Sequence, residues 1–236
     1  MDPQRKSTRR SNPTGTALGA AQAAALETVL DQLAAERASV SAVTEPRRAW
    51  KVHVEDSLTG LDVGELREAQ RIADIGSGAG FPGLVLAVAL PDSRVDLIES
   101  VGRKCEFMQR AIEAAGITNA TVVNARSEEL AAGECRETYD AATARAVGRL
   151  STLSELASPL LHDGGVLVAW KGKRDPDEEE QLDRAADKLA MQPQQVLDVG
   201  ERAGSRHRHL HLVRKAGPTP ADLPRRPGMA KKRPRG

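Results

Sequence analysis

The chain has 236 residues, of which 40% are hydrophobic and 28% charged, with a formal net charge of +1. This length suffices for one hydrophobic core with extensions rather than two full domains. Aromatic residues make up only 2% of the chain, so aromatic platforms that stack RNA bases are not expected. No run approaches the roughly 20 apolar residues of a membrane span, and the first residues lack the apolar stretch of a signal peptide. The two cysteines, Cys105 and Cys135, make neither a disulfide framework nor a metal cluster. These features predict a cytoplasmic protein that holds no metal and contacts no membrane.

The small net charge conceals an uneven distribution. Residues 1–10 contain four basic residues and one acid, and residues 214–236 contain eight basic residues and one acid, so the body between them is acidic. Basic ends on an acidic body favour contact with a polyanion, and purely solubilising tails are the alternative. We expect residues 1–16 to be a disordered basic N-terminus and residues 216–236 to be a flexible, basic, proline-rich tail.

Helices are the first predicted elements. Apolar residues between positions 17 and 37 recur at helical spacing, which predicts an amphipathic helix that packs on the rest of the domain; they are Leu26, Val29, Leu30 and Leu33. A second helix is expected over residues 46–61. Residues 17–66 would therefore form a helical extension that precedes a core at residues 67–215.

Strands and helices alternate through that core. Strands are expected at 71–75, 94–99, 121–124, 139–144, 165–171, 194–200 and 207–214, and helices at 82–90, 101–115, 128–132, 149–161 and 176–190. Such alternation predicts an α/β fold with a mostly parallel, doubly wound sheet. The last two strands fit a closing antiparallel hairpin.

The most informative segment lies between the first core strand and the next helix. It runs Asp74-Ile75-Gly76-Ser77-Gly78-Ala79-Gly80-Phe81-Pro82-Gly83. Its glycines allow backbone conformations closed to other residues and let a ligand approach the main chain. Pro82 has a φ angle suited to the first turn of a helix. Asp74 places a carboxylate beside this bare backbone, which favours a nucleotide-like ligand whose nearby part is cationic.

Three interpretations of this loop compete. Residues 78–83 match the G-x-G-x-x-G pattern of dinucleotide-binding domains, but an acid just before the turn would repel a pyrophosphate. The chain also offers no evident hydride-transfer residues. S-adenosylmethionine, whose methionine end has an ammonium group, suits the acid better, and a purely structural turn is the third alternative. Glu99 ends the second core strand, where an acid accepts hydrogen bonds from ribose hydroxyls. The expected fold class is therefore a Rossmann-like, seven-stranded S-adenosylmethionine-dependent methyltransferase fold with an N-terminal helical extension.

Several short motifs along residues 40–228 together resemble the RsmG (GidB) family, the guanine-N7 methyltransferases of 16S ribosomal RNA. They are Arg71–Gly83, Arg103-Lys104 with Phe107, Arg126–Glu129, Ala144-Arg145-Ala146, Trp170-Lys171-Gly172, His53–Ser57, Arg208-His209-Leu210 and Pro224–Gly228. Val52 departs from the family, which commonly has a basic residue before this histidine. Two roles stay open for His53: a structural one, bonded to Asp56 or to backbone, and an RNA contact.

The resemblance implies a set of site residues. Glu99 would hold the ribose, Ser127 and Glu128 would border the adenine, and Arg145 would sit at the reaction centre or the methionine end as a positioning residue. The expected cofactor-binding residues are Asp74, Gly76, Ser77, Gly78, Gly80, Phe81, Glu99, Ser127, Glu128 and Arg145. The expected RNA-binding residues are Lys171, Arg208, Arg225 and Arg226.

Two absences bear on the chemistry. The segment after the fourth core strand, residues 143–147, lacks the Asp/Asn-Pro-Pro-aromatic sequence of many amino-group methyltransferases. Neither cysteine has an evident base that would make it a nucleophile for carbon methylation. Guanine N7 needs neither device, because its lone pair is already available and the transfer requires chiefly positioning. We expect no general base.

The resulting functional prediction is methyl transfer from S-adenosylmethionine to guanine N7 in 16S rRNA, in a loop near the decoding centre as the resemblance implies. The partner would be the 30S ribosomal subunit or its RNA, not DNA, and the chain would act as a monomer. The alternatives are methylation of another RNA or a small molecule, and a nucleotide-binding regulatory module without catalysis.

Overall fold

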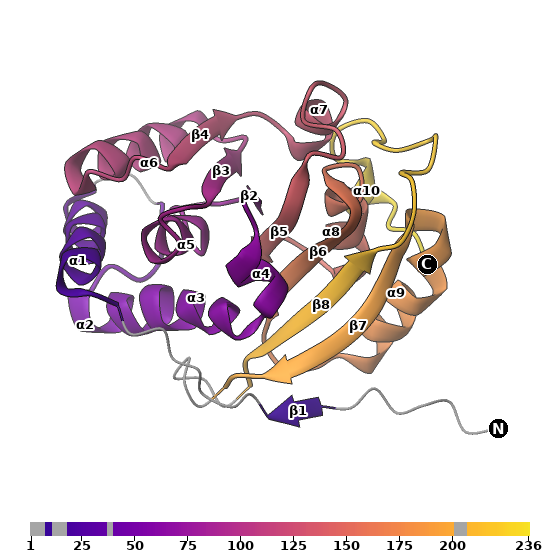
Figure 1. Cartoon of the computed structure of the whole chain (residues 1–236), viewed down its shortest axis with the longest axis horizontal. Helices are drawn as coiled ribbons and strands as arrows, with labels where there is room; N and C mark the ends of the chain where they lie inside the picture. The colour runs from indigo at the N-terminus through magenta and orange to yellow at the C-terminus, as the bar shows by residue number, and fades with distance from the viewer. Residues whose placement is uncertain (1–7, 11–17, 37–39, 201–206) are drawn as a thin grey trace.

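The computed structural model of the chain describes residues 8–10, 18–36, 40–200 and 207–236. In these residues a single sheet of eight strands has helices on both faces (Figure 1). The strand order is β1-β7-β8-β6-β5-β2-β3-β4. The strands are β1 (Thr8–Arg10), β2 (Arg71–Ile75), β3 (Arg94–Glu99), β4 (Ala120–Asn124), β5 (Tyr139–Arg145), β6 (Leu161–Lys171), β7 (Met191–Asp198) and β8 (His209–Lys215).

The helices fall into an N-terminal group and a group that alternates with the strands. The first group is α1 (Ala20–Ala35), α2 (Pro46–Ala49), the π-helical segment η1 (Trp50–Glu55), α3 (Asp56–Leu58), the 3₁₀ turn η2 (Thr59–Asp62) and α4 (Gly64–Glu68). The second group is α5 (Gly83–Ala89), α6 (Gly102–Ala115), α7 (Ser127–Ala131), α8 (Leu150–Ala157), α9 (Pro176–Leu189) and α10 (Met229–Lys232).

The sheet confirms the predicted doubly wound α/β architecture. Strand β2 pairs in parallel with β3 on one side and β5 on the other. Strand β8 is antiparallel to both β6 and β7, which is the closing hairpin expected from the sequence. The chain therefore changes direction along the sheet between β2 and β5, and ligands of such folds bind at the carboxyl ends of the strands beside this switch point.

Alternation of side chains along the strands divides the core into two hydrophobic clusters. On β6, Val166 and Val168 pack in the first cluster, whereas Leu167 and Ala169 pack in the second. The first cluster includes the apolar stripe of α1 together with residues of α5 and α6. All four residues of that stripe are buried, which confirms that this amphipathic helix packs on the domain. The helical extension thus shares a core with the sheet.

Three expectations about elements need correction. The sheet has an eighth strand, because Thr8–Arg10 pairs in parallel with β7 at the sheet edge, so these residues are not disordered. The other residues of the predicted disordered N-terminus lie outside the described residues. Helix α8 ends at Ala157 rather than near 161, since Pro159 has no amide hydrogen to continue it. The short helix α4 was not predicted, because five residues are too few to show helical periodicity.

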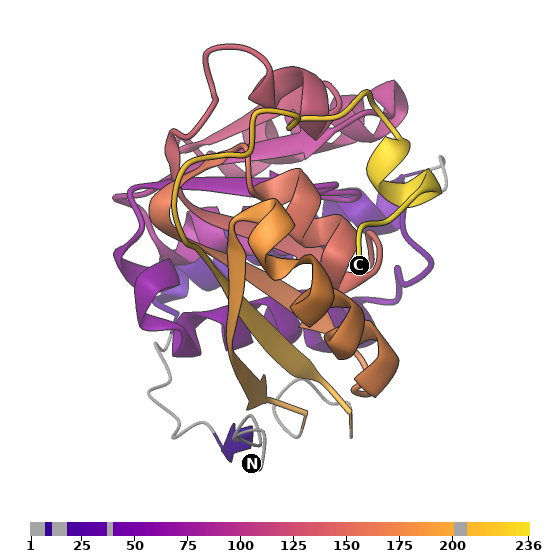
Figure 2. The ribbon, with the colours of Figure 1, turned by 90° about the vertical axis from the view of Figure 1, so that its right-hand side faces the viewer.

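The C-terminal segment also differs from expectation. Figure 2 shows it, in yellow, running along the outside of α8 and α9 rather than away from the fold. Leu223 and Ala230 are buried, 3% and 2% exposed, and belong to the second hydrophobic cluster. The guanidinium of Arg136 donates a hydrogen bond to the carbonyl of Leu223 at 3.0 Å. The expectation of a flexible arm is therefore wrong. The tail is held by buried apolar residues, which its mainly basic composition does not reveal.

Candidate cofactor and methyl-transfer site

The loop after β2 takes a shape that strongly favours glycine. Gly76, Gly78 and Gly80 have positive φ angles of 67°, 63° and 90°. A Cβ on Gly76 would lie 2.7 Å from Cγ2 of Val147, so a side chain there would also collide. The Gly76 amide donates a hydrogen bond to the carbonyl of Ile98 at 2.8 Å, which ties the loop to the end of β3. The loop thus offers close approach to backbone, as a bound nucleoside requires.

Asp74 supports this loop from inside the protein. Its Oδ1 accepts a hydrogen bond from Oγ1 of Thr143 at 2.8 Å, and its Oδ2 accepts one from the amide of Gly83 at 3.1 Å. Burial raises the pKa of the Asp74 carboxyl to about 6. The neighbouring hydroxyl of Ser77 is also turned inward and donates to the Asp74 carbonyl at 2.9 Å. Both residues therefore shape the loop and the start of α5, whereas we expected the Asp74 carboxylate to face a cationic ligand group.

Glu99, at the end of β3, is held in place at the edge of the same loop by backbone amides. Its Oε2 accepts a hydrogen bond from the amide of Gly78 at 3.1 Å, and its Oε1 accepts one from the amide of Val101 at 2.9 Å. The ammonium of Lys104 lies 3.9 Å from Oε2. Each carboxylate oxygen can accept a further hydrogen bond, so the capacity to bind a diol remains. The geometry suits the ribose role expected from the sequence.

A cavity of about 190 Å³ lies at the carboxyl ends of β2, β3 and β4. Gly76, Glu99, Ser127 and Glu128 all line it. The structure thus brings together four of the predicted cofactor residues from three separate loops. The two residues of α7 are buried, and the hydroxyl of Ser127 donates to Oε2 of Glu128 at 3.3 Å. Phe81 and Arg145 lie outside this cavity, in a second cluster.

One wall of the cavity was missed by the sequence analysis. It is formed by Gly228, Ala230 and Lys231 of the C-terminal segment. The amide of Gly228 donates a hydrogen bond to Oε1 of Glu128 at 2.8 Å. The only available signal was the presence of apolar residues within a basic tail, and that signal does not say where the tail docks.

The predicted RNA contact of Arg225 is also replaced by an internal one. Its Nε and Nη2 each lie 2.6 Å from an oxygen of the Glu155 carboxylate, in a two-pronged ion pair. Glu155 is only 3% exposed, so this guanidinium neutralises a buried charge on α8. The next residue, Arg226, is exposed to solvent and remains a candidate for contact with RNA phosphates.

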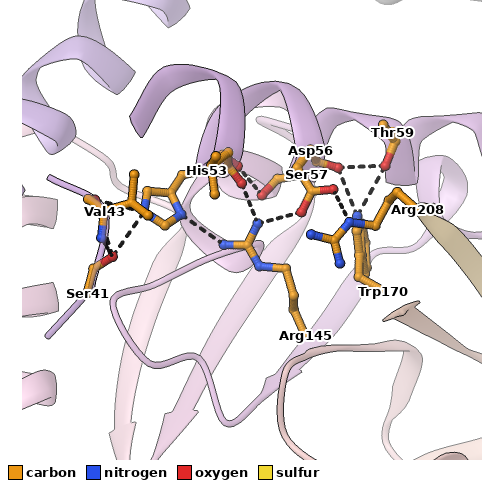
Figure 3. A network of polar contacts seen from close by, with 10 residues as sticks. Ser41, Val43, His53, Asp56, Ser57, Thr59, Arg145, Trp170 and Arg208 are labelled. Atoms are coloured by element: carbon orange, nitrogen blue, oxygen red, sulfur yellow. Dashed lines mark hydrogen bonds and ion pairs between the residues drawn. The ribbon is translucent and has the colours of Figure 1, made fainter. Parts of the chain in front are cut away.

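The second cluster is organised around Arg145, at the end of β5 (Figure 3). Its Nη1 donates hydrogen bonds to Oδ2 of Asp56 at 2.8 Å and to the carbonyl of Val52 at 3.0 Å. The other oxygen of Asp56 lies 2.7 Å from Nε of Arg208. One buried carboxylate therefore bridges two arginines from β5 and the start of β8. Arg208, expected to contact RNA, is committed to this bridge.

His53 connects the same cluster to the glycine loop. Its imidazole stacks on the ring of Phe81, with centroids 4.5 Å apart and an interplanar angle of 11°. Its Nε2 lies 3.2 Å from the carbonyl of Val43, and its Nδ1 lies 3.2 Å from Nη2 of Arg145. Burial, followed by the charge of Arg145, lowers the pKa of His53 to about 4. His53 is therefore a neutral imidazole that donates from Nε2 and accepts at Nδ1, which supports the structural role.

The helical segment that provides these side chains is fastened to the sheet. Nε1 of Trp170, on β6, donates a hydrogen bond to the carbonyl of Asp56 at 2.9 Å. A Cβ on Gly60 would lie 2.5 Å from Cζ2 of the same indole, so this glycine permits the close approach. The predicted bond between His53 and Asp56 is not direct; Arg145 stands between the two side chains.

Lys171 is the remaining residue predicted to contact RNA. Its Nζ lies 2.7 Å from Oε1 of Glu178 and donates to the carbonyl of Gly148 at 3.0 Å. Glu178 also accepts a hydrogen bond from the amide of Leu150 at 2.6 Å. Lys171 thus links the end of β6 to the starts of α8 and α9, and its ammonium is occupied within the fold.

The fold and loop define the class of the protein. The chain is similar to the Aeropyrum pernix fibrillarin structure with bound S-adenosyl-L-methionine, with a TM-score of 0.53 and 14% identity, covering 67% of this chain and 72% of that one. It is also similar to an S-adenosylmethionine-dependent methyltransferase from Aquifex aeolicus, with a TM-score of 0.52 and 15% identity, covering 71% and 93% of the two chains. The architecture is that of the S-adenosylmethionine-dependent methyltransferases.

Sequence relatives give the family. A family model named GidB, described as rRNA small subunit methyltransferase G, matches residues 22–211. A Ribosomal RNA small subunit methyltransferase G from Rubrobacter xylanophilus is 43% identical, covering 84% of this chain and 77% of the relative. One of the same name from Moorella thermoacetica is 33% identical over 95% of both chains. The chain belongs to this family and is a methyltransferase that uses S-adenosylmethionine, which excludes the non-catalytic module.

The described residues contain neither a membrane-spanning helix nor a metal-binding cluster of side chains. None of their helices is both long and apolar enough to cross a membrane. Among the same residues, no group of three or more His, Cys, Asp or Glu side chains is arranged to hold a metal ion.

Proposed function

We propose that the enzyme transfers the methyl group of S-adenosylmethionine to N7 of a guanine in 16S rRNA of the small ribosomal subunit. Membership of the GidB family supports the RNA class, since that family is described by small-subunit rRNA methylation. The observation that favours N7 comes from the titratable side chains beside the glycine loop. They already make hydrogen bonds within the protein, so they are not free to take a proton from a substrate.

The groups nearest the loop are poorly suited to remove a proton. The Nδ1 of His53 accepts from Arg145, and burial together with the charge of Arg145 lowers the pKa of the imidazole to about 4. Both oxygens of Asp74 accept hydrogen bonds within the protein. An amino group or a carbon atom must lose a proton on methylation, whereas guanine N7 has a free lone pair and no proton. A site that positions the base without removing a proton from it therefore fits methylation of guanine N7 best.

The residues present can hold the cofactor at the loop. S-adenosylmethionine supplies a methyl group on a sulfonium, which is already activated for in-line displacement. Glu99 would accept hydrogen bonds from the ribose hydroxyls, and Ser127 with Glu128 would border the adenine. Arg145, with Phe81 at the loop's end, would fix the angle between the methyl group and the base. With the methyl group already activated, these residues would need only to hold N7 in line with it, and none of them would have to accept a proton.

We further propose that the enzyme works as a monomer in the cytoplasm, on the 30S subunit or its RNA rather than on DNA. Exposed basic residues near the cavity provide the sequence-independent contact with phosphates. Arg126 and Lys231 line the cavity and are exposed, and Arg226 is exposed nearby in the chain. Their positions would guide RNA toward the cofactor.

The test is methylation with labelled S-adenosylmethionine of 30S subunits, naked 16S rRNA and an unrelated RNA, all from a strain that lacks this gene. Nucleoside mass spectrometry should find 7-methylguanosine at one position of 16S rRNA. Label in another nucleoside, or in a small molecule alone, would contradict the proposal. Comparison of subunits with naked RNA identifies the form that the enzyme recognises.

A further inference from the structure

The C-terminal strap, defined here as residues 223–235, covers the cofactor cavity in a way that the methyltransferase chemistry does not require. It crosses from α7 to α8 at the adenine end of the cavity, and α10 within it contacts α8 (Figure 2). Gly228, Ala230 and Lys231 face the cavity. The strap contributes an apolar surface through Ala230 and a cation through Lys231.

The strap is fastened to the walls of the cavity themselves. Glu128 and Thr152 both line the cavity, and each binds the strap: Glu128 accepts from the amide of Gly228 at 2.8 Å, and Oγ1 of Thr152 donates to the carbonyl of Ala230 at 3.3 Å. The ion pair of Arg225 with buried Glu155 holds the strap to α8 one turn from Thr152. Glu128, one of the two residues expected to border adenine, is therefore also a residue that holds the strap.

We propose that the strap is a component of the cofactor-binding site, and that the docked strap and the bound cofactor stabilise each other. Without the strap, the Glu128 carboxylate loses the Gly228 amide, which donates to it alongside the Ser127 hydroxyl, and the cavity loses one of its walls. A ligand that contacts the strap favours the docked state, and by linkage the docked state favours the ligand by the same factor. The exposed basic side chains of Lys231 and Lys232 would then be placed at the cavity entrance whenever the cofactor is bound.

This inference rests on the cofactor alone and not on the atom that is methylated. It also adds a role for the tail to the two that composition suggests, which are contact with a polyanion and solubilisation. The tests below contain no RNA, so their failure is distinct from failure of the N7 proposal.

The first test is calorimetry with S-adenosylhomocysteine, the demethylated product, on two neighbouring substitutions. Arg225→Ala removes the ion pair that fastens the strap, whereas Arg226→Ala removes the same charge from an exposed side chain. We expect Arg225→Ala to weaken binding at least tenfold and Arg226→Ala to leave it within twofold of wild type. Equal affinities for both variants would overturn the inference.

Because loss of Arg225 leaves the buried carboxylate of Glu155 without its main partner, a second variant weakens the strap by another route and keeps this ion pair. Gly228→Pro removes the amide hydrogen that binds Glu128 and cannot adopt the φ of 82°, while the pair of Arg225 with Glu155 is kept. We expect it to weaken S-adenosylhomocysteine binding at least fivefold with an unchanged circular dichroism spectrum. A folded Gly228→Pro variant with wild-type affinity contradicts the proposal.

A third measurement needs only the wild-type chain. Trypsin should cut after the exposed residues Lys231 and Lys232, and saturating S-adenosylhomocysteine should slow this cleavage several-fold because it favours the docked strap. Cleavage after Arg184, exposed on α9 and away from the cavity, is the internal reference. Cleavage of the strap at the same rate with and without S-adenosylhomocysteine would show that the strap and the cofactor are not coupled.

Discussion

The two halves of the candidate site are built in opposite ways. The cavity half has a volume of about 190 Å³, and its carboxylates, Glu99 and Glu128, accept hydrogen bonds from loop amides and line the open space. The other half, around Arg145, is a packed cluster in which each arginine has the same ionic partner: Asp56 lies between Arg145 and Arg208, and His53 is neutral. The first half is arranged to receive a ligand and the second to hold side chains still.

This difference separates two ways in which a substitution can lower activity. Removing a group that faces the cavity should reduce cofactor affinity and leave the fold mostly intact. Removing a member of the packed cluster should leave an opposite charge buried without a partner, which costs stability as well as rate. The following predictions test that separation, beginning with the largest expected effect.

Asp56→Ala should have the largest effect, because two arginines of low exposure lose their shared carboxylate. We expect the free energy of unfolding to fall by roughly 3 kcal/mol and methyl transfer to be lost. Urea denaturation measures the first and single-turnover methylation the second. Asp92→Ala, which removes an exposed acid from a turn, is the matched control and should change neither. A stable Asp56→Ala protein would show that the cluster does not depend on its shared ionic partner.

Glu99→Ala tests the cavity half. We expect at least a tenfold loss of affinity for S-adenosylmethionine, because a hydrogen bond to a charged group contributes about 1.5–3 kcal/mol. Some of this loss would come from release of the Gly78 amide that Glu99 binds. Calorimetry gives the affinity, and Glu106→Ala, on the exposed side of α6, serves as the control. Wild-type affinity in Glu99→Ala would remove this residue from the cofactor site.

The pH dependence of the chemical step tests the absence of a base. Single-turnover methylation of 30S subunits should be nearly flat between about pH 6.5 and 8.5, without the bell shape of an acid and base pair. Arg145→Ala should lower the rate and leave the profile flat, since this residue positions rather than transfers a proton. A steep profile with one apparent pKa, abolished by a His or Asp substitution, would reveal a base and a different target atom.

The stability of the cluster should depend on pH through His53. Its pKa is near 4 in the folded chain and near 6.5 when unfolded, so the unfolded chain takes up the proton first and stability falls as the pH drops through this interval. Asp74, with a raised pKa of about 6, acts in the opposite direction. Because wild type and His53→Gln share every other group, the difference in their free energies of unfolding should change by about 2 kcal/mol between pH 7 and pH 5. A constant difference would mean that His53 does not have a lowered pKa.

Arg226→Ala should have the smallest effect, since this side chain is exposed and outside both halves. RNA affinity should fall modestly, and the slope of log affinity against log salt should flatten by about 0.7–0.9 for one lost phosphate contact. Filter binding of 16S rRNA across salt concentrations measures this slope. An unchanged slope would mean that Arg226 contacts no phosphate.

Much of the architecture was predictable because it depends on local patterns. Strands β2 and β3 lie at the predicted residues, and every other predicted core element is present with small shifts of its ends. Runs of apolar residues and the glycine loop are enough to indicate a doubly wound fold, since each reports a local conformation. The ribose role expected for Glu99 rests on the same kind of local pattern, because strand ends of parallel sheets meet at one edge, and it stays a prediction.

The partners of charged side chains could not be predicted in this way. Lys171, Arg208 and Arg225 were assigned to RNA from their charge and motif, yet they pair with Glu178, Asp56 and Glu155. An ion pair depends on which surfaces the fold brings together, and its members here are separated by 7 to 152 positions in the chain.

The sequence by itself thus determined the class of fold, the glycine loop and the family, because glycine conformations and strand periodicity are properties of neighbouring residues. Only the tertiary structure decided that the basic tail lines the cavity beside the glycine loop and that Asp56 joins two arginines. Those features depend on docking of Leu223 and Ala230 into the second hydrophobic cluster and on burial of the charges beneath. Burial makes a distant partner necessary for each charge, and local sequence contains no information about which partner that is.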